Sequence, residues 1–285
     1  MQIVDAQVHA WSEGNSTGHH RRTPITAGML LDEMAAAGVD RALIVPPLWD
    51  PSGNEYALRM AREHPDRFAA MGVIQFGDWH ATGWRSRLAR WNEQPGMRGV
   101  RFLFNDPDRI KPYLDGAFDD VWPVLEENGT AVALLVPNAL DVAAAIAGRH
   151  PGLRIIVDHL GVPRGASGPD TFRHLPELLA LARHPNIAVK AAGVGDYAPE
   201  GYPFPSLDEP LERIFDAFGP ERIVWASELS RLRHPYRRCV THFTEELDFL
   251  SEADKALVMG GNICRIVGWD AGALREPELR RTGAS

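Results

Sequence analysis

The sequence predicts an α/β fold in which eight parallel strands close into a (β/α)₈ barrel. Eight short apolar runs recur at intervals of roughly 30 residues, the length of one strand and its helix. A segment with helical periodicity follows each run. Eight units in succession favour a closed barrel over an open sheet, and a barrel of roughly 250 residues accounts for nearly the whole chain. The runs begin at Gln2, Arg41, Phe68, Arg98, Ala131, Arg154, Ile187 and Arg222.

The alternative is an open doubly wound sheet, which commonly binds nucleotides through a glycine-rich turn. No G-x-G-x-x-G follows the first strand, and no G-x-x-x-x-G-K-[ST] occurs in the chain. We therefore predict one domain, a TIM barrel over residues 1–270, followed by a C-terminal tail at 271–285. An amphipathic helix from Tyr236 to Leu250 and another that begins at Ser251 would add helical structure after the eighth strand.

Composition excludes several classes of function. The chain has 285 residues and a net charge of −8, so no overall charge draws it to nucleic acid or to an anionic membrane. No apolar run approaches the roughly 20 residues needed to span a bilayer. Only Cys239 and Cys264 occur, and no secretory leader precedes the first strand, which favours the cytoplasm.

A repeated His-Pro pair indicates which rim of the barrel carries the site. His64, His150 and His184 each precede a proline at the end of a helical run and just before a strand. We interpret these three histidines as structural, at the floor of the barrel. Catalytic groups are therefore expected at the opposite rim, where the strands end.

Polar residues gather at that rim. In the first strand Asp5, Gln7 and His9 recur at every second position, which predicts that they point to one side. The other strand ends supply Arg101, Asp158, His159, Lys190 and Glu228. Together these residues indicate a hydrolytic site, either metal-assisted or acid–base. The alternative for Arg101 and Lys190 is a structural pairing with an acid inside the barrel.

These motifs, in this order, resemble the amidohydrolase superfamily, and the similarity spans almost the entire chain. The branch it resembles includes sugar and dicarboxylate lactonases and nonoxidative decarboxylases. The motifs are Val4-Asp5-Ala6-Gln7-Val8-His9-Ala10-Trp11, Gly99-Val100-Arg101, Asp158-His159-Leu160-Gly161, Val189-Lys190, Trp225-Ala226-Ser227-Glu228 and Met259-Gly260-Gly261-Asn262-Ile263-Cys264-Arg265.

The resemblance implies a divalent metal, Zn or Mn, held by His9, His159 and Glu228. Two departures weaken that expectation. The family's first strand usually carries His-x-His, whereas Gln7 stands at the first of these positions. Its last strand usually carries Asp, whereas Glu228 stands here. An amide oxygen is a poorer ligand than an imidazole, so we expect weaker metal binding than is usual in the family.

The same resemblance implies a role for each rim residue. Glu228 is expected to act as the general base, with His159 and His9 holding an ion or donating hydrogen bonds to the developing oxyanion. Arg101 and Lys190 are expected to bind a substrate carboxylate or hydroxyl groups, and Gln7 to contact substrate or water. Asp158 is expected to orient the ring of His159.

The rim loops carry aromatic and basic residues, which favours a small, anionic or ring-shaped substrate. We expect Trp49, Tyr197 and Tyr202 to contact it, the two tyrosines from the long irregular segment after the seventh strand. Basic and aromatic residues at 19–22, 78–80 and 231–234 belong to the same set of loops.

The favoured function is therefore hydrolysis of a carboxylate-bearing lactone or related cyclic ester. The alternative is metal-dependent nonoxidative decarboxylation of an aromatic or unsaturated acid. Hydrolysis of other esters or amides, and ligand binding without catalysis, remain open, as does assembly into a homo-oligomer.

Overall fold

Eight parallel strands form one sheet whose spatial order follows the sequence, β1 to β8, in a nearly closed (β/α)₈ TIM barrel. The computed structural model describes residues 1–16, 18–74, 82–163, 165–166 and 168–270, so the predicted tail and the loop residues at 78–80 lie outside the described part. The strands are β1 (Val4–Val8), β2 (Arg41–Ile44), β3 (Phe68–Val73), β4 (Met97–Leu103), β5 (Ala131–Leu135), β6 (Ile155–Val157), β7 (Ile187–Ala192) and β8 (Ile223–Ala226).

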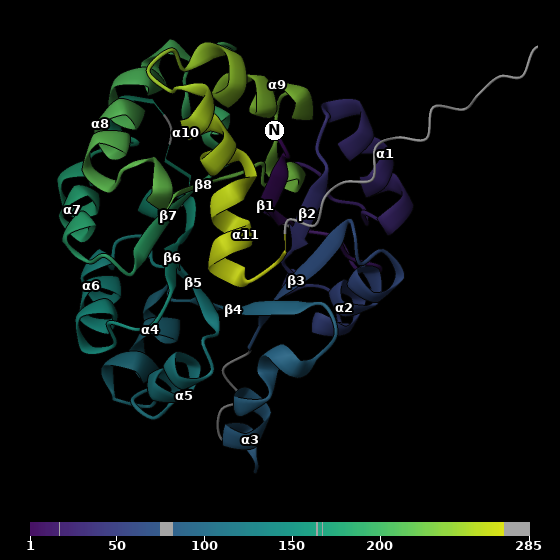
Figure 1. The fold of residues 1–285 in the computed structure, drawn as a ribbon, viewed down its shortest axis with the longest axis vertical. Coiled ribbons are helices and arrows are strands. Elements are labelled where there is room, and N and C mark those ends of the chain that lie inside the picture. Colours follow the sequence, from purple (N-terminus) through teal and green to yellow (C-terminus); the bar gives the residue numbers. More distant parts are fainter. Residues whose placement is uncertain (17, 75–81, 164, 167, 271–285) are drawn as a thin grey trace, which may run out of the picture.

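Helices surround the strands (Figure 1). They are α1 (Ala27–Ala37), α2 (Asn54–Glu63), α3 (Trp84–Ala89), α4 (Pro107–Leu114), α5 (Val121–Glu127), α6 (Leu140–Arg149), α7 (Leu175–Ala180), α8 (Asp208–Phe218), α9 (Tyr236–Thr241), α10 (Glu252–Ala256) and α11 (Asn262–Val267). Each strand begins within two residues of its predicted start. None of the described helices is long and apolar enough to cross a membrane.

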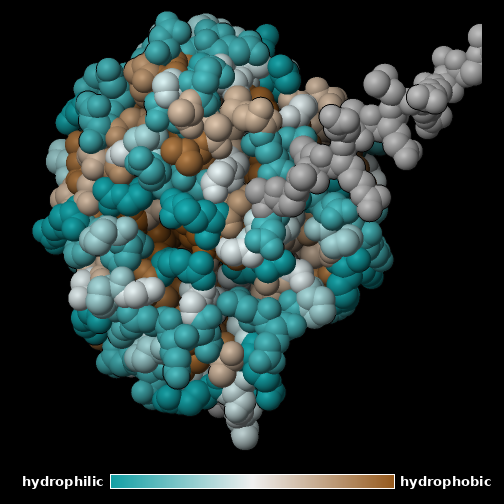
Figure 2. All heavy atoms as spheres, viewed as in Figure 1, coloured by the Kyte–Doolittle hydropathy of each residue, from teal (hydrophilic) through white to brown (hydrophobic). Residues whose placement is uncertain are grey.

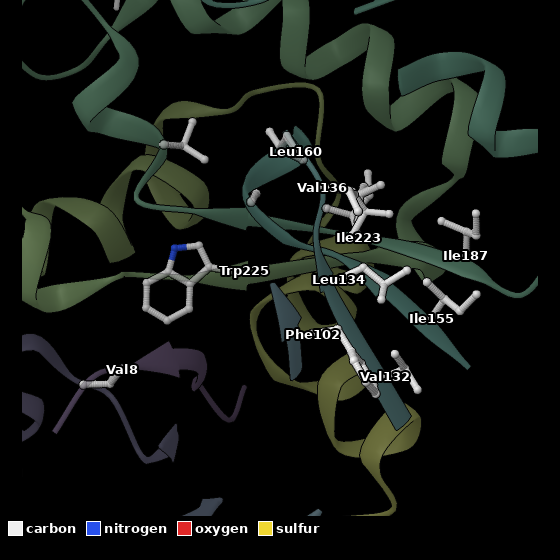
Figure 3. Close-up of a cluster of buried hydrophobic side chains, with 14 of the residues drawn as sticks. Val8, Phe102, Val132, Leu134, Val136, Ile155, Leu160, Ile187, Ile223 and Trp225 are labelled. Atoms are coloured by element: carbon white, nitrogen blue, oxygen red, sulfur yellow. The ribbon is translucent and has the colours of Figure 1, made fainter. Parts of the chain in front are cut away.

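The core has two layers because strand side chains alternate between the two faces of the sheet. The outer layer packs large side chains such as Phe102, Leu134 and Trp225 between the strands and the helices (Figure 3). The inner layer is rich in alanine, including Ala133, Ala188 and others from the remaining strands. Small inner side chains leave room within the barrel for long polar ones.

Helix α11 closes the floor of the barrel, where the strands begin, and Figure 1 shows it lying across the strands. Its Ile263 and Val267 belong to the inner hydrophobic cluster. The amide of Asn262 donates to the carbonyl of Ile223 at 2.8 Å, at the start of β8. The chain that follows α11 accepts hydrogen bonds at Gly268 and Asp270 from Arg98 and Arg41, which lie at the starts of β4 and β2. The hydrophilic residues of this face are spread among hydrophobic ones (Figure 2).

The two helices predicted after β8 differ in how well they agree with the structure. The capping box at Ser251 is present, with reciprocal hydrogen bonds to Asp254. The predicted helix from Tyr236 to Leu250 is shorter: α9 ends at Thr241, and a π-helical turn occupies His242–Glu246. The hydroxyl of Thr244 donates back to the carbonyl of Val240 at 3.2 Å, a bond that competes with regular helix geometry.

A bulge in β1 corrects the prediction that Asp5, Gln7 and His9 share one side. The pairing of β1 with β2 skips a residue between Asp5 and Val8, which reverses the alternation of side chains. Asp5 consequently points outward, where its carboxylate accepts a hydrogen bond from the Tyr236 hydroxyl of α9 at 2.6 Å. It also accepts from the backbone N–H of Ser227 at 3.0 Å, which joins β1 to the end of β8.

Burial raises the pKa of Asp5 to about 6, although hydrogen bonds from Ser227 and Tyr236 oppose the shift. The folded-state pKa thus lies above the ordinary value of 3.8. Folded protein therefore binds the proton more tightly than unfolded protein does. The resulting stabilisation is complete below about pH 4 and is lost as pH rises through about 6.

We expect Asp5→Asn to remove this pH dependence, since asparagine keeps an acceptor oxygen without titrating. Relative to the parent protein, the free energy of unfolding of the variant should rise by about 2 kcal/mol between pH 4 and 7. Urea unfolding at both pH values measures it, with the exposed Asp115→Asn as control. A difference that stays constant with pH would contradict this account of Asp5.

Candidate functional site

The predicted rim residues converge on one site. Each is at most 5% exposed, and together they come from β1, β4, β7 and the turns that follow β6 and β8. They are Gln7, His9, Arg101, Asp158, His159, Lys190 and Glu228. Side chains more than 200 positions apart in the chain thus share one buried polar cluster.

A continuous series of polar contacts crosses the barrel beneath the mouth. Arg101 Nε donates to Asp158 Oδ2 at 2.7 Å, and Lys190 Nζ donates to Asp158 Oδ1 at 2.8 Å. Lys190 also donates to Gln7 Oε1 at 3.0 Å, and Gln7 Nε2 donates to Glu228 Oε2. Because an ammonium group can only donate, Lys190 fixes the amide of Gln7 with its NH₂ group toward Glu228.

This series changes the interpretation of three residues. Lys190 has no exposed surface and Gln7 has none either, so neither lines the cavities described below. They contact Asp158 and Glu228, and the substrate contacts expected for them stay predictions. Asp158 likewise binds the two cations rather than orienting the ring of His159. The structural pairing considered for Lys190 and Arg101 is thus present.

Asp158 is ionised although it is fully buried. Burial alone would raise its pKa, but Lys190 and Arg101 hold the pKa of this carboxyl far below its ordinary value. A buried charge is tolerated where partners of opposite sign and good hydrogen bonds surround it. The two cations therefore make Asp158 a fixed negative charge below the mouth of the barrel.

Two residues of the site adopt the left-handed backbone conformation, which side chains other than glycine seldom adopt. His159 has φ of 56° and Glu228 has φ of 54°. Each is the second residue after the end of a strand, so the chain turns sharply there and brings the side chain inward. Because β6 ends at Val157, Asp158 and His159 can both reach the interior although they are adjacent. Such strained positions are concentrated at functional sites.

Glu228 is the centre of the upper part of the site. Its Oε1 lies 3.2 Å from His9 Nε2, and its Oε2 lies 3.6 Å from His159 Nε2. Burial opposes ionisation of Glu228, but His159 and His9 hold its pKa well below the ordinary value. Desolvation lowers the pKa of His159.

Two cavities, of about 330 and 210 Å³, open onto this centre. Both are lined by His19, His159, Tyr197, Glu228 and Arg231, so the reactive groups stand at their junction. The smaller cavity also contains Trp49 and Arg101. The larger adds His20, Arg22 and Arg233, which makes its wall strongly basic.

The two tyrosines that were predicted to contact substrate from the loop after β7 differ in position. Tyr197 lines both cavities, whereas Tyr202 is absent from the lining of either. The hydroxyl of Tyr202 donates to Glu246 at 2.5 Å, and its ring packs against Phe204 and the guanidinium of Arg238. These contacts hold Tyr202 toward the helical segment after β8, and we leave it out of the substrate site.

One group of potential metal ligands is found among the described residues. The ligand atoms of His9, His19 and Glu228 all lie within 4.8 Å of one another. His19 replaces the expected His159 in this group. The only signal for His19 in the sequence is general, a histidine in a basic loop after the first strand.

These strand-end groups and the barrel that holds them match a known family. A family model described as amidohydrolase matches residues 4–269. The chain belongs to the amidohydrolase family. This amidohydrolase is 29% identical to L-fucono-1,5-lactonase from Burkholderia ambifaria, over 92% of the chain and 93% of that protein.

Solved structures share the fold of this amidohydrolase at low sequence identity. An amidohydrolase from Burkholderia multivorans with bound zinc superposes with a TM-score of 0.77 at 20% identity, covering 94% of this chain and 99% of that one. A 5-carboxyvanillate decarboxylase from Sphingomonas paucimobilis superposes with a TM-score of 0.66 at 16% identity, covering 94% and 99%. The fold is thus found among both hydrolases and decarboxylases.

We expect Lys190→Met to destabilise the protein strongly, because it leaves Asp158 buried with one cation and removes the donor to Gln7. Breaking a buried pair on one side typically costs about 3–5 kcal/mol. The control is Lys111→Met, which removes an exposed pair with Asp115 and should cost at most about 0.5 kcal/mol. Equal free energies of unfolding for both variants would refute the role given to Lys190.

Proposed function

We propose that this amidohydrolase hydrolyses a small carboxylate-bearing lactone or related cyclic ester. The observation that carries the proposal is the position of Glu228, an ionised carboxylate at the junction of two cavities and in contact with two imidazoles. A buried carboxylate in such a position can accept a proton from water. The similarity to a lactonase over nearly the whole chain supports the same reaction class.

Basic groups in both cavities support an anionic substrate. Arg101 uses its Nε to bind Asp158, and its guanidinium lines the smaller cavity. Arg231 lines both cavities, and Arg22 and Arg233 line the larger one. Guanidinium groups bind carboxylates through paired hydrogen bonds. Trp49 and Tyr197 supply aromatic surface for a ring.

In the proposed reaction, water attacks the carbonyl carbon of the lactone while Glu228 takes one of its protons. The ring C–O bond then breaks, and the departing alkoxide receives that proton, which yields the hydroxy acid. Because its pKa is low, Glu228 is a weak base, so the carbonyl must be polarised strongly by neighbouring groups. A bound divalent metal, zinc or manganese, would supply polarisation and lower the pKa of a bound water.

Nonoxidative decarboxylation is the second candidate. It is favoured by the cations of the smaller cavity, which could hold a substrate carboxylate beside His159, and by the decarboxylase among proteins of the same fold. The two reactions differ in proton balance in mildly acidic solution, where the released CO₂ does not ionise to bicarbonate. Lactone opening releases a proton, because the product acid ionises, whereas decarboxylation consumes one. A screen of lactones and aromatic acids followed by pH change separates them.

We expect Glu228→Gln to lower kcat for the lactone found in that screen by about 10²–10⁴-fold, since glutamine cannot accept the proton. Glutamine keeps the size of the side chain, and melting curves would show whether the fold survives. Glu55→Gln, an exposed pair with Arg62, serves as control and should leave kcat unchanged. Full turnover by the Glu228 variant would eliminate it as the base.

We expect Arg231→Gln to raise KM for a carboxylate-bearing lactone about 10–100-fold, the loss of one hydrogen bond to a charged group. A neutral lactone of the same ring size should show no such change, because it offers no carboxylate. Arg173→Gln, at an exposed pair with Asp170, is the matched control. If KM rises equally for both substrates, Arg231 does not bind the substrate carboxylate.

A further inference from the structure

We propose that the larger cavity is a phosphate subsite and that the lactone hydrolysed here carries a phosphate ester. The observation that carries the proposal is a group of three arginines, Arg22, Arg231 and Arg233, on the wall of that cavity. The identity of the substrate rests on the lactone hydrolysis proposed above, whereas the subsite itself rests on these three side chains.

The three guanidinium groups are available to a ligand. None of them forms a hydrogen bond or an ion pair with another residue of the described ranges. The cations of the smaller cavity differ, because Arg101 is bound to Asp158 and Arg109 to Asp106. The chain has a net charge of −8, so an overall excess of basic residues does not explain three unpaired cations on one wall.

Two carboxylates also line the larger cavity, and each has partners of its own. Oδ1 of Asp196 accepts a hydrogen bond from the backbone N–H of Arg233 at 3.2 Å and lies 3.6 Å from His234 Nε2. Glu228 accepts a hydrogen bond from the amide of Gln7. With three guanidinium groups against two carboxylates, the wall keeps a net positive charge.

A backbone contact holds the three arginines in one region. Arg22 comes from the loop between β1 and α1, and Arg231 and Arg233 come from the segment between β8 and α9. The backbone N–H of Arg21 donates to the carbonyl of Ser230 at 2.8 Å, and Ser230 has no exposed surface. This bond joins the two segments next to the arginines, so the backbone needs little ordering when an anion binds.

A phosphate monoester matches this wall better than a carboxylate does. It has three terminal oxygens and a charge of about −1.5 to −2 at pH 7. A carboxylate has two oxygens and a single charge. Each guanidinium presents N–H donors in pairs, which suit two oxygens of one anion. Three such groups can therefore share the oxygens of a single phosphate and neutralise its charge.

The exposure of the residues indicates how the substrate is oriented. Arg22 and Arg233 are exposed and Arg231 is half-buried, whereas Glu228 is 2% exposed. A phosphate bound by the arginines would lie at the outer end of the cavity, with the lactone ring reaching inward to Glu228. This arrangement keeps the phosphate away from the carboxylate, which would repel it. We therefore expect the phosphate on a side arm of the lactone, away from the ring carbonyl.

The test is the affinity of the full-length protein for 6-phospho-D-gluconate, measured by calorimetry and compared with that for D-gluconate, which lacks only the phosphate. We expect the parent protein to bind the phosphate ester at least about 10-fold more tightly, as one hydrogen bond to a charged group would give. Arg22→Gln and Arg233→Gln should each weaken binding of the ester by about 10–100-fold, with no matching loss for gluconate. Arg173→Gln, at an exposed pair with Asp170, is the matched control and should change neither affinity.

Three results would overturn the proposal. They are equal affinities of the parent protein for the two acids, unchanged affinity of both arginine variants for the ester, and binding of inorganic phosphate as tight as that of the ester. The last result would identify free phosphate as the occupant of the cavity. Neither acid is a lactone, so these results leave the test of lactone hydrolysis unaffected. Full turnover by Glu228→Gln would in turn remove the proposed base and leave the subsite in place.

Discussion

The pairing of Lys190 with Asp158 is the interaction on which the site depends. An ammonium group without exposed surface needs a fixed negative partner, and Asp158 in turn needs both Lys190 and Arg101 to remain ionised. Lys190 can reach this depth because its strand neighbours on the inner face, Ala188 and Ala192, are small. The same ammonium group also donates to Gln7 and so orients its amide. The amide in turn donates to Oε2 of Glu228, which leaves Oε1 on the side of the mouth.

The reactive groups lie where regular strand geometry stops. A bulge in β1 sends Asp5 outward and Gln7 inward, and left-handed residues at the ends of β6 and β8 turn His159 and Glu228 into the barrel. The strain of these positions is balanced by burial and by bonds such as that between Glu228 and Gln7. The regular strands therefore hold the site in place, and the bulge and the left-handed residues direct the reactive side chains into it.

The sequence predicted the parts of the molecule that follow a period. All eight strands were found because apolar runs and helical segments alternate regularly, and the strand ends identified most of the buried cluster. Depth within the barrel has no such period, so the sequence does not show that Lys190 and Gln7 are fully buried. The direction of Asp5 depends on a bulge of one extra residue in β1. This bulge is visible only in the pairing of β1 with β2. His19 and Tyr202 lie in irregular loops whose paths are set by tertiary contacts.

Helix α11 also bears on how the chain is made. It closes the floor beside β1: a Cβ added at Gly260, just before it, would lie 2.6 Å from the backbone oxygen of Gln2. The first strand is synthesised long before this helix emerges from the ribosome. The base of the nascent barrel therefore stays open until Asn262–Val267 has been translated, long after the strands that it covers.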